Sequence, residues 1–296
     1  KKRNQEIRAR NGNIFQKQLA IYHQNIPGKK NPKDVIIEVE TLLQKLVPDI
    51  LVISEADTKV VTAWKYPGYK AHQGKVDGAE LVRVSALVRS GIPHTITFLE
   101  CEVPHIVINF KLENKQYRCT GIYREWNHGA VESSRSEQTD RWTIFEDAWV
   151  ANNRRCRHSI LLGDLNFCYK GNGTPHQASL EPIRSSVMDN IVFRGWVQLI
   201  TKNTRHQGAN QRPSCLDHIY MNFPDQVKYS VNKAFSGSDH NCVGVVIKTK
   251  KFIQQGEEFI SRCWSKVNWS WGKYLLKYSS VFYKAFSFKN PNEILE

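Results

Sequence analysis

The sequence predicts an α/β or layered α+β fold, because strand-like and helix-like patterns alternate along it. Continuous apolar runs at residues 50–53 and 159–162 are typical of strands that are covered on both faces. Apolar residues recur at helical spacing after residue 34 and again around residue 145. The mixture of both patterns favours sheets covered by a few helices.

The first half of the chain is expected to form strands around one helix. The strands are expected at residues 18–26, 49–57, 79–89 and 105–126. The last of these contains turn material at 112–116 and is expected to fold as a hairpin. Between the first two strands, apolar residues at helical spacing predict a helix from Asp34 that Pro48 closes.

The second half begins with a predicted long helix. Ser134 and Glu137 match a capping box, and the helix is expected to reach Asn152. One face of it carries the bulky residues Trp142, Phe145 and Trp149. A Gly-rich loop at 170–176 and a helix through Val187 should follow the strand that starts at Ser159. Further strand-like runs lie at 195–200, 214–222 and 237–248.

The charge balance favours a polyanionic partner. The 296 residues contain 42 Lys and Arg against 28 Asp and Glu, a formal net charge of +14. Such a surface attracts nucleic acid before an acidic membrane. The basic residues are spread along the chain, so the alternative is that many of them solvate helix faces.

Cysteine usage and hydropathy indicate a soluble intracellular protein with no membrane partner. The seven cysteines stand singly without a CxxC pair, which argues against a zinc finger or a disulfide scaffold and favours buried, reduced thiols. Nowhere do eighteen apolar residues run together, and the first residues lack a secretory apolar stretch.

Polar side chains stand at the ends of many apolar runs. These residues are Asn25, Glu55, Tyr123, Asp164, Asn166, Asp217, Asp239 and His240. For a single residue such as Asp164, a turn is the simpler explanation. Several acidic groups at one sheet edge would repel one another unless a cation or a shared proton relieved the charge. Oxygen ligands without a His/Cys cluster favour Mg²⁺.

Six short motifs occur in order: HQN, SEAD, GIY, GDLN, LDHI and SDH. This series resembles the endonuclease/exonuclease/phosphatase superfamily, whose fold is like that of deoxyribonuclease I. The resemblance spans about residues 19–250. It implies a four-layer α/β sandwich, with two mixed β-sheets packed face to face and helices on the outside.

The resemblance implies a metal site. Glu55 in SEAD would bind Mg²⁺, which Mn²⁺ could replace. Asn25 in HQN would help to place the metal or the phosphate, and Asp239 in SDH would be a second metal ligand.

The same resemblance implies catalytic roles. Asp164 would deprotonate the attacking water while Asn166 holds the water and the phosphate in line. His240 would donate to a phosphoryl oxygen, oriented by Asp217 as in a carboxylate–histidine pair. Tyr123 would contact the phosphate or stabilise the leaving oxygen.

Departures from the motifs narrow the substrate class. Inositol phosphatases typically continue GD with an arginine, which GDLN lacks, and repair enzymes usually place an aspartate two residues after the Asn25 position, where Pro27 stands. Residues 203–222 are most similar to endonuclease domains of non-LTR retrotransposons. The expected DNA-contacting residues are Arg124, Lys170, Thr204, Arg205 and Ser214. For Arg124, a surface ion pair with Glu125 is the alternative.

The predicted function is therefore a Mg²⁺-dependent endonuclease that nicks one strand of double-stranded DNA and leaves a 3′-hydroxyl to prime reverse transcription. The alternatives are an AP endonuclease-like repair nuclease, an inactive nucleic-acid-binding module, and a phosphatase for lipid or small phosphoesters. The resemblance also implies a nuclear site of action, with element RNA and a reverse transcriptase domain of the same polypeptide as partners.

Three segments are expected. Residues 1–18 form a basic N-terminal extension and residues 19–250 form the endonuclease-like domain. Residues 251–296 are basic and rich in aromatic residues. They are expected to be a connector toward a downstream reverse transcriptase or, alternatively, a helix packed on the main body.

Overall fold

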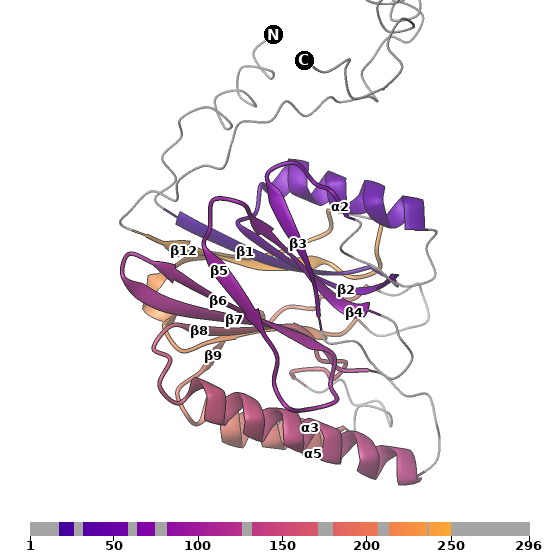
Figure 1. Ribbon diagram of the computed structural model, residues 1–296. Coiled ribbons are helices and arrows are strands. Elements are labelled where there is room, and N and C mark those ends of the chain that lie inside the picture. The colour runs from indigo at the N-terminus through magenta and orange to yellow at the C-terminus, as the bar shows by residue number, and fades with distance from the viewer. Residues whose placement is uncertain are drawn as a thin grey trace, which may run out of the picture. The chain divides into compact units, whose positions relative to one another are not determined.

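Two six-stranded sheets pack face to face in this computed structural model (Figure 1). The structure describes residues 18–26, 32–58, 64–74, 82–125, 132–170, 180–206, 213–235 and 237–249. The expected extension 1–18 except for Gln18, the expected connector 251–296, and most of the predicted loop at 170–176 lie outside the described residues.

The first sheet has the strand order β11-β12-β1-β2-β4-β3, and only its β1–β2 pair is parallel. Its strands are β1 (Gln18–Asn25), β2 (Ile50–Thr58), β3 (Tyr69–Gln73), β4 (Val82–Arg89), β11 (Val227–Lys233) and β12 (Cys242–Lys248). The second sheet has the order β5-β6-β7-β8-β10-β9, and only β7–β8 is parallel. Its strands are β5 (His94–Thr97), β6 (His105–Leu112), β7 (Lys115–Tyr123), β8 (Ser159–Asp164), β9 (Val197–Gln198) and β10 (Asp217–Met221).

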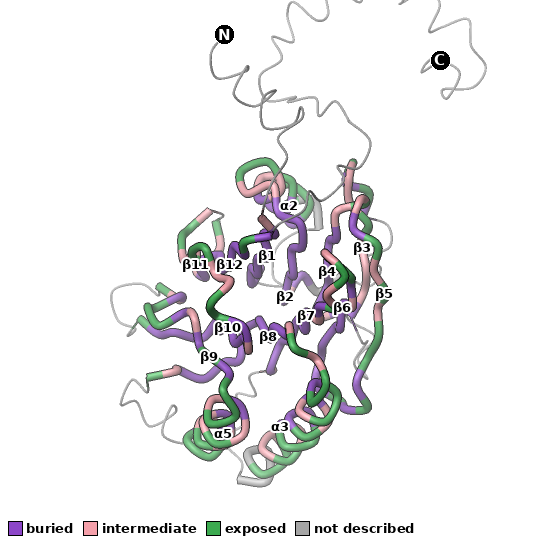
Figure 2. The backbone as a smooth tube through the Cα atoms, turned by 90° about the vertical axis from the view of Figure 1, so that its left-hand side faces the viewer, coloured by how far each residue is buried: buried purple, intermediate pink, exposed green. Residues whose placement is uncertain are grey.

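Helices cover the outer face of each sheet, which gives the predicted four layers (Figures 1 and 2). Helix α2 (Pro32–Leu46) packs on the first sheet through buried residues such as Val39 and Leu42. Helices α3 (Glu132–Asn153) and α5 (Glu181–Val187) pack on the second sheet, and a π-helical turn, η2 (Met188–Val192), continues α5. A short 3-10 turn, η3 (Pro224–Gln226), precedes β11.

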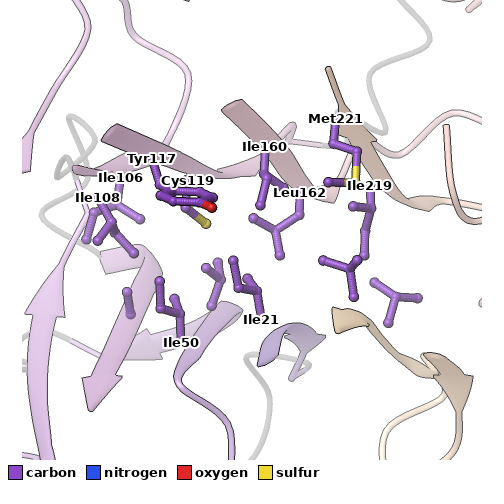
Figure 3. Close-up of a cluster of buried hydrophobic side chains, with 14 of the residues drawn as sticks. Ile21, Ile50, Ile106, Ile108, Tyr117, Cys119, Ile160, Leu162, Ile219 and Met221 are labelled. Atoms are coloured by element: carbon purple, nitrogen blue, oxygen red, sulfur yellow. The ribbon is translucent and has the colours of Figure 1, made fainter. Parts of the chain in front are cut away.

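The largest core lies between the two sheets (Figure 3). Ile21 and Ile50 of the first sheet lie opposite Ile160 and Leu162 of the second, and all four are almost fully buried. These residues belong to the apolar runs that predicted buried strands, so hydrophobic burial explains why β1, β2 and β8 occupy the sheet centres. The described cysteines are free, and all but Cys156 are buried, as expected.

Most expected elements are confirmed, including the hairpin. Its turn residues Glu113 and Asn114 both have positive φ, the backbone that a two-residue type I′ turn requires. The capping box was wrong, because α3 begins at Glu132 and Ser134 therefore lies inside the helix. Three strands, β3, β5 and β11, were missed; all lie at sheet edges and are half exposed, so they lack a clear apolar pattern. The described part of the chain contains no helix long and apolar enough to cross a membrane.

Gly163 provides a stability test just before the strand end that carries Asp164. Its φ is +156°, and an added Cβ would lie 1.9 Å from the carbonyl oxygen of Ile122 on β7. Gly195 also has a positive φ, +90°, but a Cβ there would meet nothing within 4 Å. We expect Gly163→Ala to lower the free energy of unfolding by about 3 kcal/mol or more, and Gly195→Ala to lower it by about 1–2 kcal/mol.

Chemical denaturation of both variants measures this difference. Equal losses of unfolding free energy in the two variants would show that β7 moves aside without cost, which would contradict the tight contact between Gly163 and Ile122.

Candidate active site

The predicted polar residues converge where strand ends of both sheets meet. Asn25 and Glu55 end or interrupt β1 and β2 of the first sheet, and Tyr123 and Asp164 end β7 and β8 of the second. The parallel pairs β1–β2 and β7–β8 each bring two carboxyl ends to one edge. Asp217 begins antiparallel β10 directly opposite Asp164.

Asn25 links the two sheets at this edge. Its side-chain Nδ2 donates to Glu55 Oε1 at 2.9 Å and to Asp164 Oδ2 at 2.7 Å. Asn25 and Asp164 are almost completely buried, whereas Glu55 is partly exposed. One amide therefore holds a carboxylate of each sheet in a single site through charge-assisted hydrogen bonds.

Glu55 reaches this position through an irregular backbone. Its φ is +55°, which is uncommon outside glycine and asparagine, and the β2–β4 register shifts between Ser54 and Thr58. Such a bulge re-aims a side chain and is frequent beside active sites. Asn166 also has a positive φ, +51°, which turns the chain after β8 so that its backbone N donates to Asp164 Oδ1 at 2.8 Å.

A carboxylate–histidine pair lies beside Asp164. His240 Nδ1 and Asp217 Oδ2 are 2.9 Å apart, and both residues are buried. Ligand atoms of Asp164, Asp217 and His240 all lie within 4.8 Å of one another. Because Nδ1 of His240 is engaged by Asp217, Nε2 is the ring nitrogen that can face a substrate.

The buried charges shift one another's pKa values. Burial, reinforced by the nearby charges of Asp217 and Glu55, raises the pKa of Asp164 to about 7. Burial opposes the charged form of His240, but the adjacent Asp217 carboxylate outweighs it and raises the pKa of His240 to about 9. The pKa of Asp217 is lowered despite its burial, because it faces the His240 imidazole. A carboxyl group titrating near neutrality beside a cationic imidazole is an arrangement suited to general acid–base chemistry.

Contacts from the HQN segment fix the loop that carries His240. Gln24 Nε2 donates to the His240 carbonyl at 3.0 Å. Ser238 Oγ donates to the Asn25 carbonyl at 2.8 Å and accepts from the His240 backbone N at 3.1 Å. The sequence interpretation missed these roles, although Gln24 stands in the HQN motif and Ser238 in the SDH motif.

Tyr123 lies at the same edge. Its hydroxyl hydrogen-bonds Glu55, and burial together with the Glu55 and Asp164 charges raises its pKa well above the usual range. The phenol therefore keeps its proton at neutral pH and donates it in a hydrogen bond to the Glu55 carboxylate.

The donor set fits a hard divalent cation. Glu55 supplies a partly exposed carboxylate, and Asn25 Oδ1 is a buried oxygen without a hydrogen-bond partner among the described residues. Mg²⁺ prefers one or two protein oxygens and keeps its remaining positions for water and substrate phosphate. Glu55 and Asn25 are therefore the residues that would hold it.

Asp239, the other predicted ligand, forms an ion pair with Arg205, with Nε and Oδ2 2.9 Å apart. A metal role for Asp239 would require this pair to open, and it stays a prediction.

The structure corrects the DNA-contact role of Arg124. Its side chain is 4% exposed, and its guanidinium donates to the backbone carbonyls of Leu165 and Asn166. It is thus unavailable to a phosphate and instead supports the GDLN loop. The alternative ion pair with Glu125 was also wrong, since Glu125 pairs with Arg83, with Nε and Oε1 3.5 Å apart.

Thr204 is likewise corrected. It is fully buried, and its hydroxyl accepts the backbone N–H groups of Leu216 and Asp217 at 3.1 and 3.0 Å. Thr204 therefore positions Asp217 and does not face DNA. Ser214 is buried as well and forms a backbone bridge with Arg205.

Two of the predicted DNA-contacting residues remain accessible. Lys170 is exposed, and the Arg205 side chain is 31% exposed beside Asp239. His218 and Tyr220, which adjoin Asp217 in the LDHI segment, are packing residues: both are buried, and His218 Nδ1 lies 2.9 Å from the Tyr220 hydroxyl.

Acidic, amide and imidazole groups thus gather where strands of the two packed sheets end. This combination of fold and site is typical of enzymes that cleave phosphoesters. The family model for the Endonuclease/Exonuclease/phosphatase family matches residues 22–240, and the chain belongs to this family.

Solved structures show the same fold at low sequence identity. The endonuclease domain of TRAS1, a telomere-specific non-LTR retrotransposon, is 16% identical with a TM-score of 0.54; the match covers 79% of this chain and 100% of that one. An AP endonuclease from Archaeoglobus fulgidus is 16% identical with a TM-score of 0.59, covering 78% and 100%. D. rerio TDP2 complexed with single-strand DNA product is 13% identical with a TM-score of 0.57, covering 78% and 99%. No curated protein matches the chain.

Proposed function

We propose that this chain is a Mg²⁺-dependent DNA endonuclease of the non-LTR retrotransposon type, which nicks one strand and leaves a 3′-hydroxyl. The observation that carries the proposal is the Asn25 amide joining Glu55 to Asp164 beside the Asp217–His240 pair. The retrotransposon type is favoured by residues 203–222, which resemble such endonuclease domains, and the TRAS1 endonuclease domain shares the fold. The +14 charge and the exposed Lys170 support a polyanionic substrate.

The proposed reaction is hydrolysis of a P–O3′ bond. Asp164, held by the Asn166 backbone N–H and the Asn25 amide, takes a proton from water as the water oxygen bonds to phosphorus. Protonated His240 donates to a phosphoryl oxygen on which negative charge builds up. The O3′ that leaves, contacted by the Tyr123 hydroxyl, takes up a proton from solvent water, which produces a 3′-hydroxyl and a 5′-phosphate. A divalent ion held by Glu55 and Asn25 would supply charge neutralisation at the phosphate.

On the same grounds we propose double-stranded DNA as the substrate. We also propose element RNA and a reverse transcriptase domain of the same polypeptide as partners, and the nucleus as the place of action.

The experiment that tests the proposed activity is incubation of the purified chain with supercoiled plasmid and Mg²⁺, followed by mapping of the nicked ends. Nicks with 3′-hydroxyl ends support the proposal. Selective cleavage at abasic sites would instead favour a repair nuclease, and salt-dependent binding without cleavage would favour an inactive binding module. Phosphate release from small phosphoesters, with no effect on DNA, would favour a phosphatase.

Removal of the metal should abolish nicking. We expect a chelator to stop plasmid nicking and added Mg²⁺ to restore it, with Mn²⁺ as a working substitute. Glu55→Gln removes the charge of the main oxygen donor and should raise the Mg²⁺ concentration for half-maximal activity at least ~10-fold. Glu100→Gln changes an exposed glutamate outside the site and should leave that concentration unchanged. An identical Mg²⁺ dependence in the Glu55 variant would exclude Glu55 as a metal ligand.

Activity should fall at alkaline pH. His240 must be protonated to donate, and its pKa is raised to about 9, whereas Asp164 must be ionised to accept a proton, and its pKa is raised to about 7. The value of kcat/KM should therefore be highest between these two pH values and should be lost as the pH rises through the upper one. Asp217→Asn removes the carboxylate charge that raises this pKa. In that variant the alkaline limb should move to lower pH. If the alkaline limb of the pH profile does not move in Asp217→Asn, the loss of activity at high pH is caused by titration of a group other than His240.

A further inference from the structure

His23 is a buried imidazole that the proposed chemistry does not use. It lies in β1 two residues before Asn25, and its side chain is 0% exposed. Its Nε2 lies 2.9 Å from Ser54 Oγ on the neighbouring strand β2. Its Nδ1 lies 3.5 Å from Asp217 Oδ1, across the gap between the two sheets.

Nδ1 of His23 and Oδ1 of Asp217 are each within reach of the other and have no other partner among the described residues. Both are buried polar atoms that lack a short hydrogen bond in the structure. Leaving such atoms unpaired is costly, so a proton on Nδ1 directed at Oδ1 is the arrangement that satisfies both. Ser54 Oγ, which can donate as well as accept, is compatible with this form of the ring.

The Asp217 carboxylate is therefore bracketed by two imidazoles. Its Oδ2 faces His240 Nδ1 at 2.9 Å, and its Oδ1 faces His23. The Thr204 hydroxyl also hydrogen-bonds the Asp217 side chain. A carboxylate held at one oxygen only can still rotate, whereas contacts at both oxygens fix its plane and with it the orientation of the imidazole that it holds.

We infer that His23 is a positioning residue, whose Nδ1 proton donates to Asp217 Oδ1 and so fixes the carboxylate that orients His240. The inference rests on the proposed function, because His240 is the group proposed to donate to the phosphate. It extends the carboxylate–histidine pair into a four-residue series that runs from Ser54 through His23 and Asp217 to His240. This series crosses from the first sheet to Asp217 of the second and returns to His240, two residues before β12 of the first sheet.

Two substitutions separate the positioning role from simple packing. His23→Leu replaces the imidazole with an apolar side chain of similar size and removes the donor, so kcat should fall about 10-fold while KM stays unchanged. His23→Asn can place its amide Nδ2 where Nδ1 stood and should keep kcat within about 3-fold of wild type. Packing alone predicts the opposite order, because leucine fills the site better than asparagine.

A spectrum of the ring nitrogens tests the inference without reference to activity. Long-range ¹H–¹⁵N correlation of ¹⁵N-histidine-labelled wild-type protein, with His23 assigned from the His23→Asn spectrum, should show a proton on Nδ1 of His23. An unprotonated Nδ1 would overturn the inference, as would wild-type kcat in His23→Leu or a His23→Asn variant as slow as His23→Leu. If wild type shows no nuclease activity, the proposed function fails, while the spectrum still decides whether His23 donates to Asp217.

Discussion

Asp164→Asn should lower the rate of plasmid nicking by about 10²–10⁴-fold, the range that a positioned general base contributes. The Asp164 carboxylate is fully buried and accepts two hydrogen bonds, one from Asn25 Nδ2 at the end of β1 and one from the Asn166 backbone N–H just after β8. Asparagine has nearly the same shape but cannot take a proton from water.

The substitution removes a buried carboxyl group whose pKa is already raised to about 7, but one of its two N–H donors, on Asn25 or Asn166, then faces an NH2 group at a cost of about 1–3 kcal/mol. The fold should survive this loss. The control is Asp140→Asn on α3, where the aspartate is exposed, and nicking should be unchanged. Wild-type nicking by a natively folded Asp164→Asn would remove Asp164 from the reaction.

His240→Gln should lower the nicking rate by about 10²–10³-fold, the loss typical of one donor that stabilises developing negative charge. Glutamine can still donate to Asp217 but carries no positive charge and cannot reproduce the imidazole donor at the phosphate. The variant leaves the buried Asp217 carboxylate facing a neutral partner, which should lower its stability. The nicking assay should therefore be run well below the melting temperature of the variant. His158→Gln, a half-buried histidine near the other end of β8, is the control and should nick at the wild-type rate. An unchanged rate in His240→Gln would contradict the proposed role.

Polar residues at strand ends were the most reliable signal in the sequence. Asn25 and Asp164 end buried strands and Asp217 begins one, so burial of these strands in the sheets determines where the three polar residues lie. The same reasoning could not show that one amide, Asn25, would join the two sheets. That contact depends on how the sheets pack, which is set by many residues far apart in the chain.

Burial of polar side chains was the part that the sequence could not predict. Arg124 and Thr204 stand in motifs that resemble DNA-contacting segments, yet both are buried and hydrogen-bonded to backbone groups that support the site. The residue type alone does not show whether a charged or hydroxyl side chain is exposed to solvent or hydrogen-bonds a buried backbone group. The edge strands β3, β5 and β11 were missed for a related reason, since a half-exposed strand has only a weak apolar pattern.

The measurement that tests the central claim most directly is the nicking rate of the double variant Asp164→Asn/His240→Gln beside both single variants. If the two groups act on one phosphate in a single site, the double variant should be within about 10-fold of the slower single variant, because groups that act as a unit show strongly non-additive losses. Losses that multiply to the product of the two single effects would contradict a single cooperating site. A single variant that nicks at the wild-type rate would contradict it as well.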